Sequence, residues 1–210
     1  MAEDEDSDLL EDLYVDVLVT ETPARVGEPD DAIRHCEGRL FRWKETGDKS
    51  DTLATIEWMQ VEYGYGVNHG VPGFEIADAH SQELHDLHVV LFDENEQLRP
   101  GFDELGGLGS DLLVIELVKV NEAKNFDVYA AELLEHVLRR WSQGCFAAVY
   151  IEDAEPAPRL AELLLARGFQ WRKSTSFGLY LADLNAVRPE LPGEVPRLNR
   201  LGPPPGSSTH

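Results

Sequence analysis

The chain has few cysteines, few basic residues and no long apolar run. Only Cys36 and Cys145 occur among its 210 residues, too few for a disulfide framework in a chain of this size. No run of about 18 apolar residues appears, which excludes a helical membrane span. The chain starts with acidic residues where a secretory signal is basic and then apolar. These absences predict a soluble, cytoplasmic protein with two free thiols and no membrane partner.

The shortage of basic residues leaves a large negative charge. Forty acidic residues and eighteen basic ones give a formal net charge of −22. Charge of this sign opposes binding to DNA, RNA or anionic lipid, so no nucleic-acid partner is expected. It suits a basic partner, such as a polyamine, an aminoglycoside or a basic protein segment. A generally acidic surface, of the kind found in high-GC or moderately salt-tolerant proteomes, is the other interpretation.

Composition divides the chain into a middle and two tails. Residues 1–12 contain seven acidic side chains, and residues 185–210 contain six prolines and end in Gly-Ser-Ser-Thr-His. Such segments bury too little apolar surface to fold, so both are predicted to be disordered. Residues 13–184 then form a single domain.

Within this domain, strand-type and helix-type patterns of apolar residues can be told apart along the sequence. Residues 14–20 are rich in β-branched side chains and predict a strand, and residues 30–35 predict a helical turn. The ranges 38–44 and 52–63 predict a hairpin. Glycine and proline between 64 and 73 predict a loop.

Further along, helical and extended patterns alternate. Leucine spacing predicts a helix over 78–93 that begins at Asp78 or Ser81, and a continuous apolar run predicts a central strand over 112–120. The remaining predicted elements are a helix over 126–142, a strand over 145–151, a helix over 159–167 and a hairpin of 169–172 with 177–181. This order predicts an α/β (α+β mixed) fold: a central mixed sheet flanked by helices, with a right-handed crossover.

Two phrases in this region resemble a known family. The run from Ala161 to Phe169, AELLLARGF, is similar to the helix ending that precedes the last hairpin in the GNAT superfamily of acyl-CoA-dependent N-acyltransferases. The run from Val118 to Asn125 resembles that family's central strand and the start of its pyrophosphate loop. The resemblance is best over 111–181. It implies a GNAT-like acyltransferase fold, acetyl-CoA or another acyl-CoA as cofactor, and a small-molecule amine or basic peptide as acceptor.

The family writes its pyrophosphate loop as Arg or Gln, two residues, Gly, one residue, then Gly or Ala. Aligning the double leucine of the helix places Asn125 at the Arg/Gln position, Val128 at the first glycine and Ala130 at the last. Ala130 agrees with the pattern. Val128 and Asp127 depart from it, because one adds a branched side chain and the other a negative charge where phosphate should approach. The resemblance implies this cofactor-binding set: Val118, Lys119, Val120, Asn125, Phe126, Asp127, Val128, Tyr129 and Ala130.

Glu116 is the candidate general base. It is an ionisable residue within the apolar run of the predicted central strand. Strict alternation along that strand places it on the same side as Val114 and Val118. The other interpretation is a strand-edge carboxylate in contact with water or an arginine.

The general acid is less well marked. The family's tyrosine, four residues before the helix-ending glycine, falls on Leu164, which has no proton to give. Tyr129 and Tyr150 are the candidate substitutes.

Histidines, a cysteine and glycines are further candidate sites. His80, His85 and His88 lack the extra ligands of a zinc site, so a solvated polar face and no metal are predicted. Cys145 precedes an apolar strand and is predicted to be a buried, unreactive thiol. The glycines of 106–109 precede a strand, which is the wrong context for a nucleotide loop.

Two functions follow from these residues. The first is an N-acetyltransferase that acts on an amine, favoured by Ala130 and Glu116. The second is a catalytically inactive GNAT-fold interaction module, favoured by Val128 and Asp127, which binds a protein partner or forms a homodimer.

Overall fold

A seven-stranded mixed sheet runs through the part of the chain that the computed structural model describes. The described residues are 13–21, 27–43, 51–102, 105, 109–152, 158–173 and 177–184. The strands lie in the order β1-β2-β3-β4-β5-β7-β6. Their bounds are β1 (Leu13–Glu21), β2 (Ile33–Arg42), β3 (Ala54–Val61), β4 (Asp111–Val120), β5 (Cys145–Glu152), β6 (Gln170–Lys173) and β7 (Gly178–Asp183). Both predicted tails, 1–12 and 185–210, lie outside the described residues.

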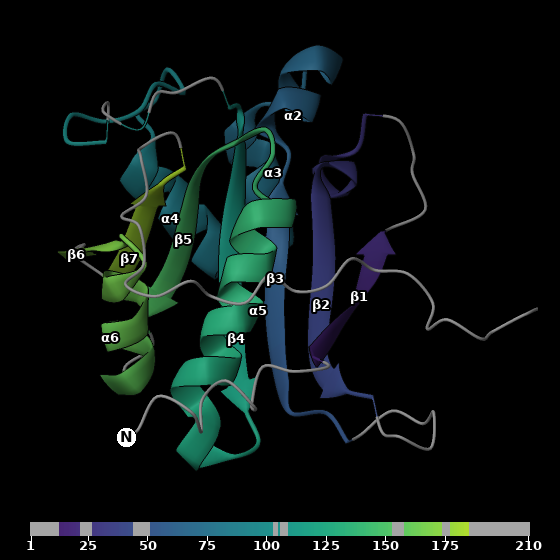
Figure 1. Cartoon of the computed structure of the whole chain (residues 1–210). Helices are drawn as coiled ribbons and strands as arrows, with labels where there is room; N and C mark the ends of the chain where they lie inside the picture. Colours follow the sequence, from purple (N-terminus) through teal and green to yellow (C-terminus); the bar gives the residue numbers. More distant parts are fainter. Residues whose placement is uncertain are drawn as a thin grey trace, which may run out of the picture.

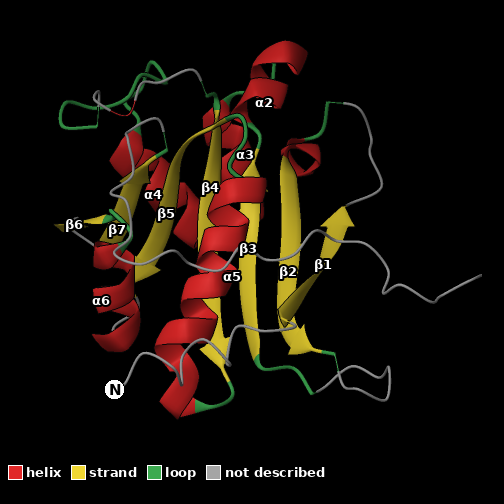
Figure 2. Cartoon of the chain, viewed as in Figure 1, coloured by secondary structure: helices red, strands yellow, loops and turns green. Residues whose placement is uncertain are grey.

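Helices cover both faces of this sheet (Figures 1 and 2). The helices α2 (Tyr63–His69), α3 (Gly73–His80) and α4 (Gln82–Leu91) pack on one face, and α5 (Phe126–Arg140) and α6 (Pro158–Ala166) pack on the other. Two 3₁₀ turns, η1 (Pro29–Ala32) and η3 (Ala123–Asn125), precede β2 and α5. The predicted α/β class, a mixed sheet flanked by helices, is confirmed. In the described part of the chain, no helix has the length and apolar character needed to cross a membrane.

Two apolar cores lie on the two faces of the sheet. The α5-side core is built on alternate residues of β2, β3 and β4, and its fully buried members include Leu40, Ile56, Trp58, Leu113, Leu133, Leu134 and Val137. The α4-side core uses the other face, with Val61, Ile76, Leu87, Leu91, Leu112, Ala147 and Val149 among its fully buried members. Alternation along the strands supplies both cores, since successive side chains point to opposite faces.

The strand pairings change character in the middle of the sheet. From β1 to β4 each strand pairs antiparallel with the next, whereas β4 and β5 are parallel and are joined through α5. The parallel pairing ends at Ile115 opposite Tyr150, although β4 continues to Val120. Figure 1 shows the two strands diverging toward their arrowheads. The end of β4 therefore separates from β5 just before the chain enters α5.

Most predicted elements are confirmed, with two corrections between β3 and β4. The predicted loop over 64–73 is wrong, because it contains α2 and the start of α3. The helix predicted over 78–93 is two helices that meet at Ser81, whose extended backbone interrupts the run and whose hydroxyl accepts the Leu84 N–H at 3.1 Å. Gly66 lies inside α2, and it is a glycine because a Cβ there would meet the Val71 carbonyl oxygen at 2.6 Å. Its glycine marks close packing here and not a turn.

Candidate active site at the divergence of β4 and β5

The free side of β4 is the first feature of this site. In the described ranges, β5 pairs with β4 only from Asp111 to Ile115, so residues 116–120 lie beyond the shared ladder. Three predicted cofactor-binding residues, Val118, Lys119 and Val120, belong to this segment. Backbone amides along a strand edge pair readily with an extended ligand that carries amides of its own. The geometry offers such an edge.

Glu116 sits at the point where the divergence begins. Glu57 pairs with Leu117 and Trp58 pairs with Ile115, so Glu116 is an extra residue on β4, a β-bulge. The bulge corrects the predicted alternation, because Val114 packs in the α4-side core whereas Val118 packs in the α5-side core. Glu116 cannot share a side with both. Bulges of this kind re-aim a side chain next to a site.

The surroundings of Glu116 are polar. Its Oε2 lies 4.0 Å from Nδ1 of His35, and its side chain is 38% exposed. Burial raises the pKa of Glu116, the charged form of His35 opposes that rise, and Glu57 adds to it. The ring of His35 stands 4.9 Å from the ring of His80 at the end of α3. Glu116 therefore faces the side of the sheet that carries α3.

Neither His35 nor its role was predicted from the sequence. His35 is on β2, which is separated from β4 by β3, and no motif links the two residues along the chain. The available signal was only that His35 shares a strand face with Ile33 and Glu37.

The two candidate tyrosines lie on the other face. Tyr129 is on α5, is 2% exposed and packs in the α5-side core, with its hydroxyl 3.5 Å from the amide nitrogen of Asn125. Tyr150 packs at the edge of the same core and is half-buried. It pairs in register with Ile115, at the last rung before the strands diverge. Tyr150 is therefore next to the divergence, whereas Tyr129 is enclosed.

The N-terminus of α5 carries the remaining predicted cofactor residues. Asn125 is buried and its side-chain amide donates to Glu122 at 2.8 Å. Asp127, in the first turn, is bound by the Arg159 guanidinium at 2.7 Å. Arg159 comes from the start of α6, donates to the Ala123 carbonyl and lies 5.2 Å from the ring centroid of Phe126. A cation thus bridges the two helices here.

The start of α5 combines small, apolar and charged side chains. Ala130 is fully buried in the α5-side core, and Val128 packs partly against the same core. The charge of Asp127, which opposes phosphate, is balanced by Arg159. The Asp127–Arg159 pair thus lies at the N-terminus of α5, where a helix end favours negative charge.

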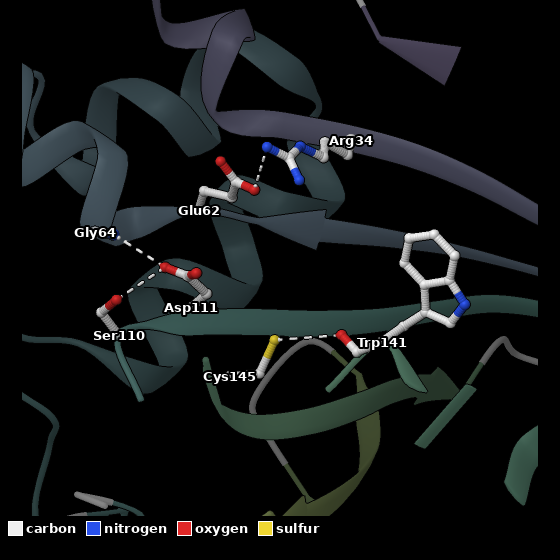
Figure 3. Close-up of polar contacts among 7 residues, drawn as sticks. All are labelled: Arg34, Glu62, Gly64, Ser110, Asp111, Trp141 and Cys145. Carbon is white, nitrogen blue, oxygen red and sulfur yellow. Dashed lines mark hydrogen bonds and ion pairs between the residues drawn. The ribbon is translucent and has the colours of Figure 1, made fainter. Parts of the chain in front are cut away.

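The opposite end of β4 holds a second polar network that is structural (Figure 3). Asp111 accepts the Gly64 N–H at 3.1 Å and the Ser110 hydroxyl at 3.0 Å, which ties α2 to the start of β4. Cys145 is buried with its thiol 4.0 Å from the Trp141 carbonyl oxygen. Burial, with nearby carboxylates, raises the pKa of Cys145 to about 12. A thiol that stays protonated is a poor nucleophile, as predicted for Cys145.

The histidines of α3 and α4 do not form a solvated face as predicted. His88 is 4% exposed, its Nδ1 lies 3.3 Å from the Tyr63 hydroxyl and its ring stacks on Phe92 at 4.8 Å. His85 instead pairs with Asp78 at 3.2 Å. Among the described residues, no group of three or more potential ligands is arranged to hold a metal ion. His88 is an aromatic core residue.

Comparison with known proteins gives no assignment. No protein-family model matches this chain, and no curated protein sequence matches it. The GNAT resemblance therefore stays a prediction, and functional proposals depend on the geometry described above.

Proposed function

We propose that this protein has a GNAT-like fold and transfers an acetyl or other acyl group from acyl-CoA to an amine. The observation that carries the proposal is the position of Glu116. This half-buried carboxylate stands on a bulge of β4, directly after the last rung that β4 shares with β5. A ligand that lies against the free edge of β4 would have Glu116 beside its reacting end.

Two parts of the chain would hold the acyl-CoA. The free edge of β4, Val118 to Val120, would pair with the amides of the pantetheine arm, and the start of α5, Asn125 to Ala130, would face the pyrophosphate together with Arg159. When bound, acyl-CoA supplies a thioester whose carbonyl carbon bonds to the amine nitrogen as the carbon–sulfur bond breaks and the thiolate takes up a proton.

Glu116 and Tyr150 would manage the protons on opposite faces of the sheet. The Glu116 carboxylate accepts a proton from the acceptor's ammonium group, and burial helps because it raises the pKa of this carboxyl and makes it a stronger base. Tyr150, at the last rung on the α5 side, holds a proton at its hydroxyl near the divergence. The enclosed position of Tyr129 makes it the weaker candidate.

The charge around Glu116 supports a cationic acceptor. Glu57 and Glu116 lie on neighbouring strands, and the whole chain has a formal net charge of −22. A field of this sign raises the local concentration of cations. A small-molecule amine or a basic peptide therefore remains the proposed acceptor class.

The first test is calorimetric titration of the protein with acetyl-CoA, with desulfo-CoA as a control that lacks the thiol. We expect micromolar binding of both and, with a polyamine added, release of free thiol. Glu116→Gln should keep the binding and lower the turnover by about 10²- to 10⁴-fold, the usual contribution of a general base. Absence of binding up to millimolar acetyl-CoA would overturn the proposal.

One observation favours a second candidate, an inactive interaction module. Asp127 and Arg159 already form an ion pair at the start of α5, so the charges at this helix end are balanced without a bound anion. Replacing Val128 by glycine should strengthen acetyl-CoA binding if this is a cofactor site. If neither form binds, sedimentation analysis for a homodimer is the next measurement.

A further inference from the structure

Glu116 on β4 lies close to His35, which belongs to β2, two strands away in the sheet. His35 is on β2 opposite Met59 of β3, and Met59 in turn is opposite Val114 of β4. Glu116 stands on the β4 bulge, and its Oε2 lies 4.0 Å from Nδ1 of His35.

The helix side holds His35 in place. The ring of His80, the last residue of α3, packs 4.9 Å from the ring of His35, with an interplanar angle of 38°. His80 also feels Asp30 from η1 and Glu83 from α4. Glu57 of β3 acts on Glu116 directly, and His80 of α3 faces His35, while Asp30 of η1 and Glu83 of α4 act on His80.

We propose that His35 is a positioning residue for Glu116: its ring, which packs against His80, turns the carboxylate toward the α3 side, from which the acceptor amine approaches. This inference rests on the proposed function, since it assigns the pair to the amine site. His35 acts through Glu116 and does not itself remove the proton.

Two neighbours act on Glu116 with opposite sign, which makes the proposal measurable. The positive charge of His35 lowers the pKa of Glu116, whereas the negative charge of Glu57 raises it. A structural role for His35 in packing would not produce this pattern. Both side chains are partly exposed, so their replacement should leave the protein folded.

The experiment is an NMR titration of glutamate carboxyl carbons in the full chain, with Glu116→Gln used to assign the Glu116 signal. We expect His35→Asn to move the Glu116 titration to higher pH and Glu57→Gln to move it to lower pH. His35→Arg retains a positive charge and should restore the wild-type position. His69→Asn, on exposed α2, is the matched control and should change nothing. A Glu116 titration that is the same in His35→Asn and wild type overturns the inference.

Turnover of acetyl-CoA with spermidine gives a second readout. We expect His35→Asn to move the acidic limb of the pH–rate profile to higher pH, with a roughly two- to fivefold loss of rate on that limb and little change at the alkaline end. If the NMR shifts occur but wild type neither binds acetyl-CoA nor turns it over, the proposed function fails and the amine-site assignment fails with it, while the His35–Glu116 coupling stands. If turnover occurs without the NMR shifts, only the role of His35 fails.

Discussion

The two faces of the sheet are covered by different kinds of side chain. The face under α5 and α6 is almost wholly apolar and centres on Trp58, whose ring packs edge-on to Trp141 at 5.5 Å. The face under α2, α3 and α4 includes buried His88 beside Phe92, and His80 at its margin. The α4 side of the sheet therefore carries the paired histidine and carboxylate, whereas the α5 side is centred on a large apolar core.

This difference explains where a site can form. A carboxylate on the α5 side would have to enter a close-packed apolar core, where an unpaired charge is strongly unfavourable. On the α4 side, Glu116 keeps partial exposure and has His35 beside it. Glu116 lies on the same face as Val114, and the bulge beside it puts Val118 on the opposite face. Chemistry and stability are thus separated by the two sides of a single strand.

The largest expected effect comes from opening the α5-side core at Trp58. Its side chain is fully buried, so Trp58→Ala should lower the free energy of unfolding by about 3–5 kcal/mol. Urea denaturation followed by circular dichroism measures this. Trp171→Ala on β6 is the control, because that ring is 46% exposed and should change stability little.

Trp58→Phe sharpens the same comparison. The indole nitrogen of Trp58 has no hydrogen-bond partner among the described residues, so its removal leaves no acceptor unsatisfied. The phenylalanine variant should therefore lose clearly less stability than the alanine variant. Equal losses would mean that the contact of the indole with Trp141, and not buried volume, dominates at this position.

A smaller effect is expected where the chain enters the sheet between the two cores. A Cβ at Gly109 would meet backbone atoms at the start of β5, as close as 2.4 Å to the carbonyl carbon of Cys145. Backbone cannot turn aside, so Gly109→Ala should lower stability by about 1–3 kcal/mol in the same denaturation experiment. Gly64→Ala is the control, since its Cβ would mainly meet the rotatable hydroxyl of Ser110. An equal loss in both variants would contradict the backbone argument.

Local signals in the sequence predicted the elements but not their meeting points. The apolar run 112–120 and the amphipathic range 126–142 carry strong periodicity, and both elements were predicted within two residues of their ends. The short α2 was missed, because the glycines of 64–73 that usually mark a turn serve close packing here. Periodicity is a property of a single segment, so it predicts a helix or strand well when that segment alone determines the structure.

The candidate site needed information from several strands. Glu116 is recognisable as an ionisable residue in an apolar run, and it lies on the same face as Val114 as predicted, but not on that of Val118, because a bulge depends on pairing with β3. His35 and Arg159 were missed for a similar reason, since each approaches its partner from another element. The sequence shows which residues are unusual, and only the fold shows which of them meet.

Lowering the pH should reduce the stability of the folded protein mainly through its buried histidines. Burial lowers the pKa of His80, His88 and His136 in the folded protein. An unfolded histidine takes up its proton near pH 6.5, so below that value the unfolded state binds more protons than the folded one. Stability should be full above about pH 6.5 and should fall as the pH drops through the folded-state pKa values.

Urea midpoints across this pH range would measure the effect, with His88→Gln as the variant that isolates the most buried histidine. Glutamine keeps a polar group near Tyr63 but cannot titrate, so the loss of stability on acidification should be smaller than in wild type. The comparison cancels the carboxyls Glu116 and Glu132, whose pKa values burial raises. If the urea midpoints of wild type and variant fall in parallel with pH, His88 has the same pKa in the folded and the unfolded state.

The smallest expected effect lies at the joint between α3 and α4, which positions His80 against His35. Ser81 ends α3 and caps α4, where its hydroxyl accepts the Leu84 N–H at 3.1 Å. Ser81→Ala leaves that N–H without its cap and should lower stability by about 1 kcal/mol, whereas Ser81→Thr should retain most of it. If the cap also fixes the end of α3, the alanine variant should move the Glu116 titration in the direction expected for His35→Asn, because His80 no longer holds His35 in place. A stability loss without that movement would show that the α4-side face tolerates a loosened joint and that His35 is oriented by the sheet alone.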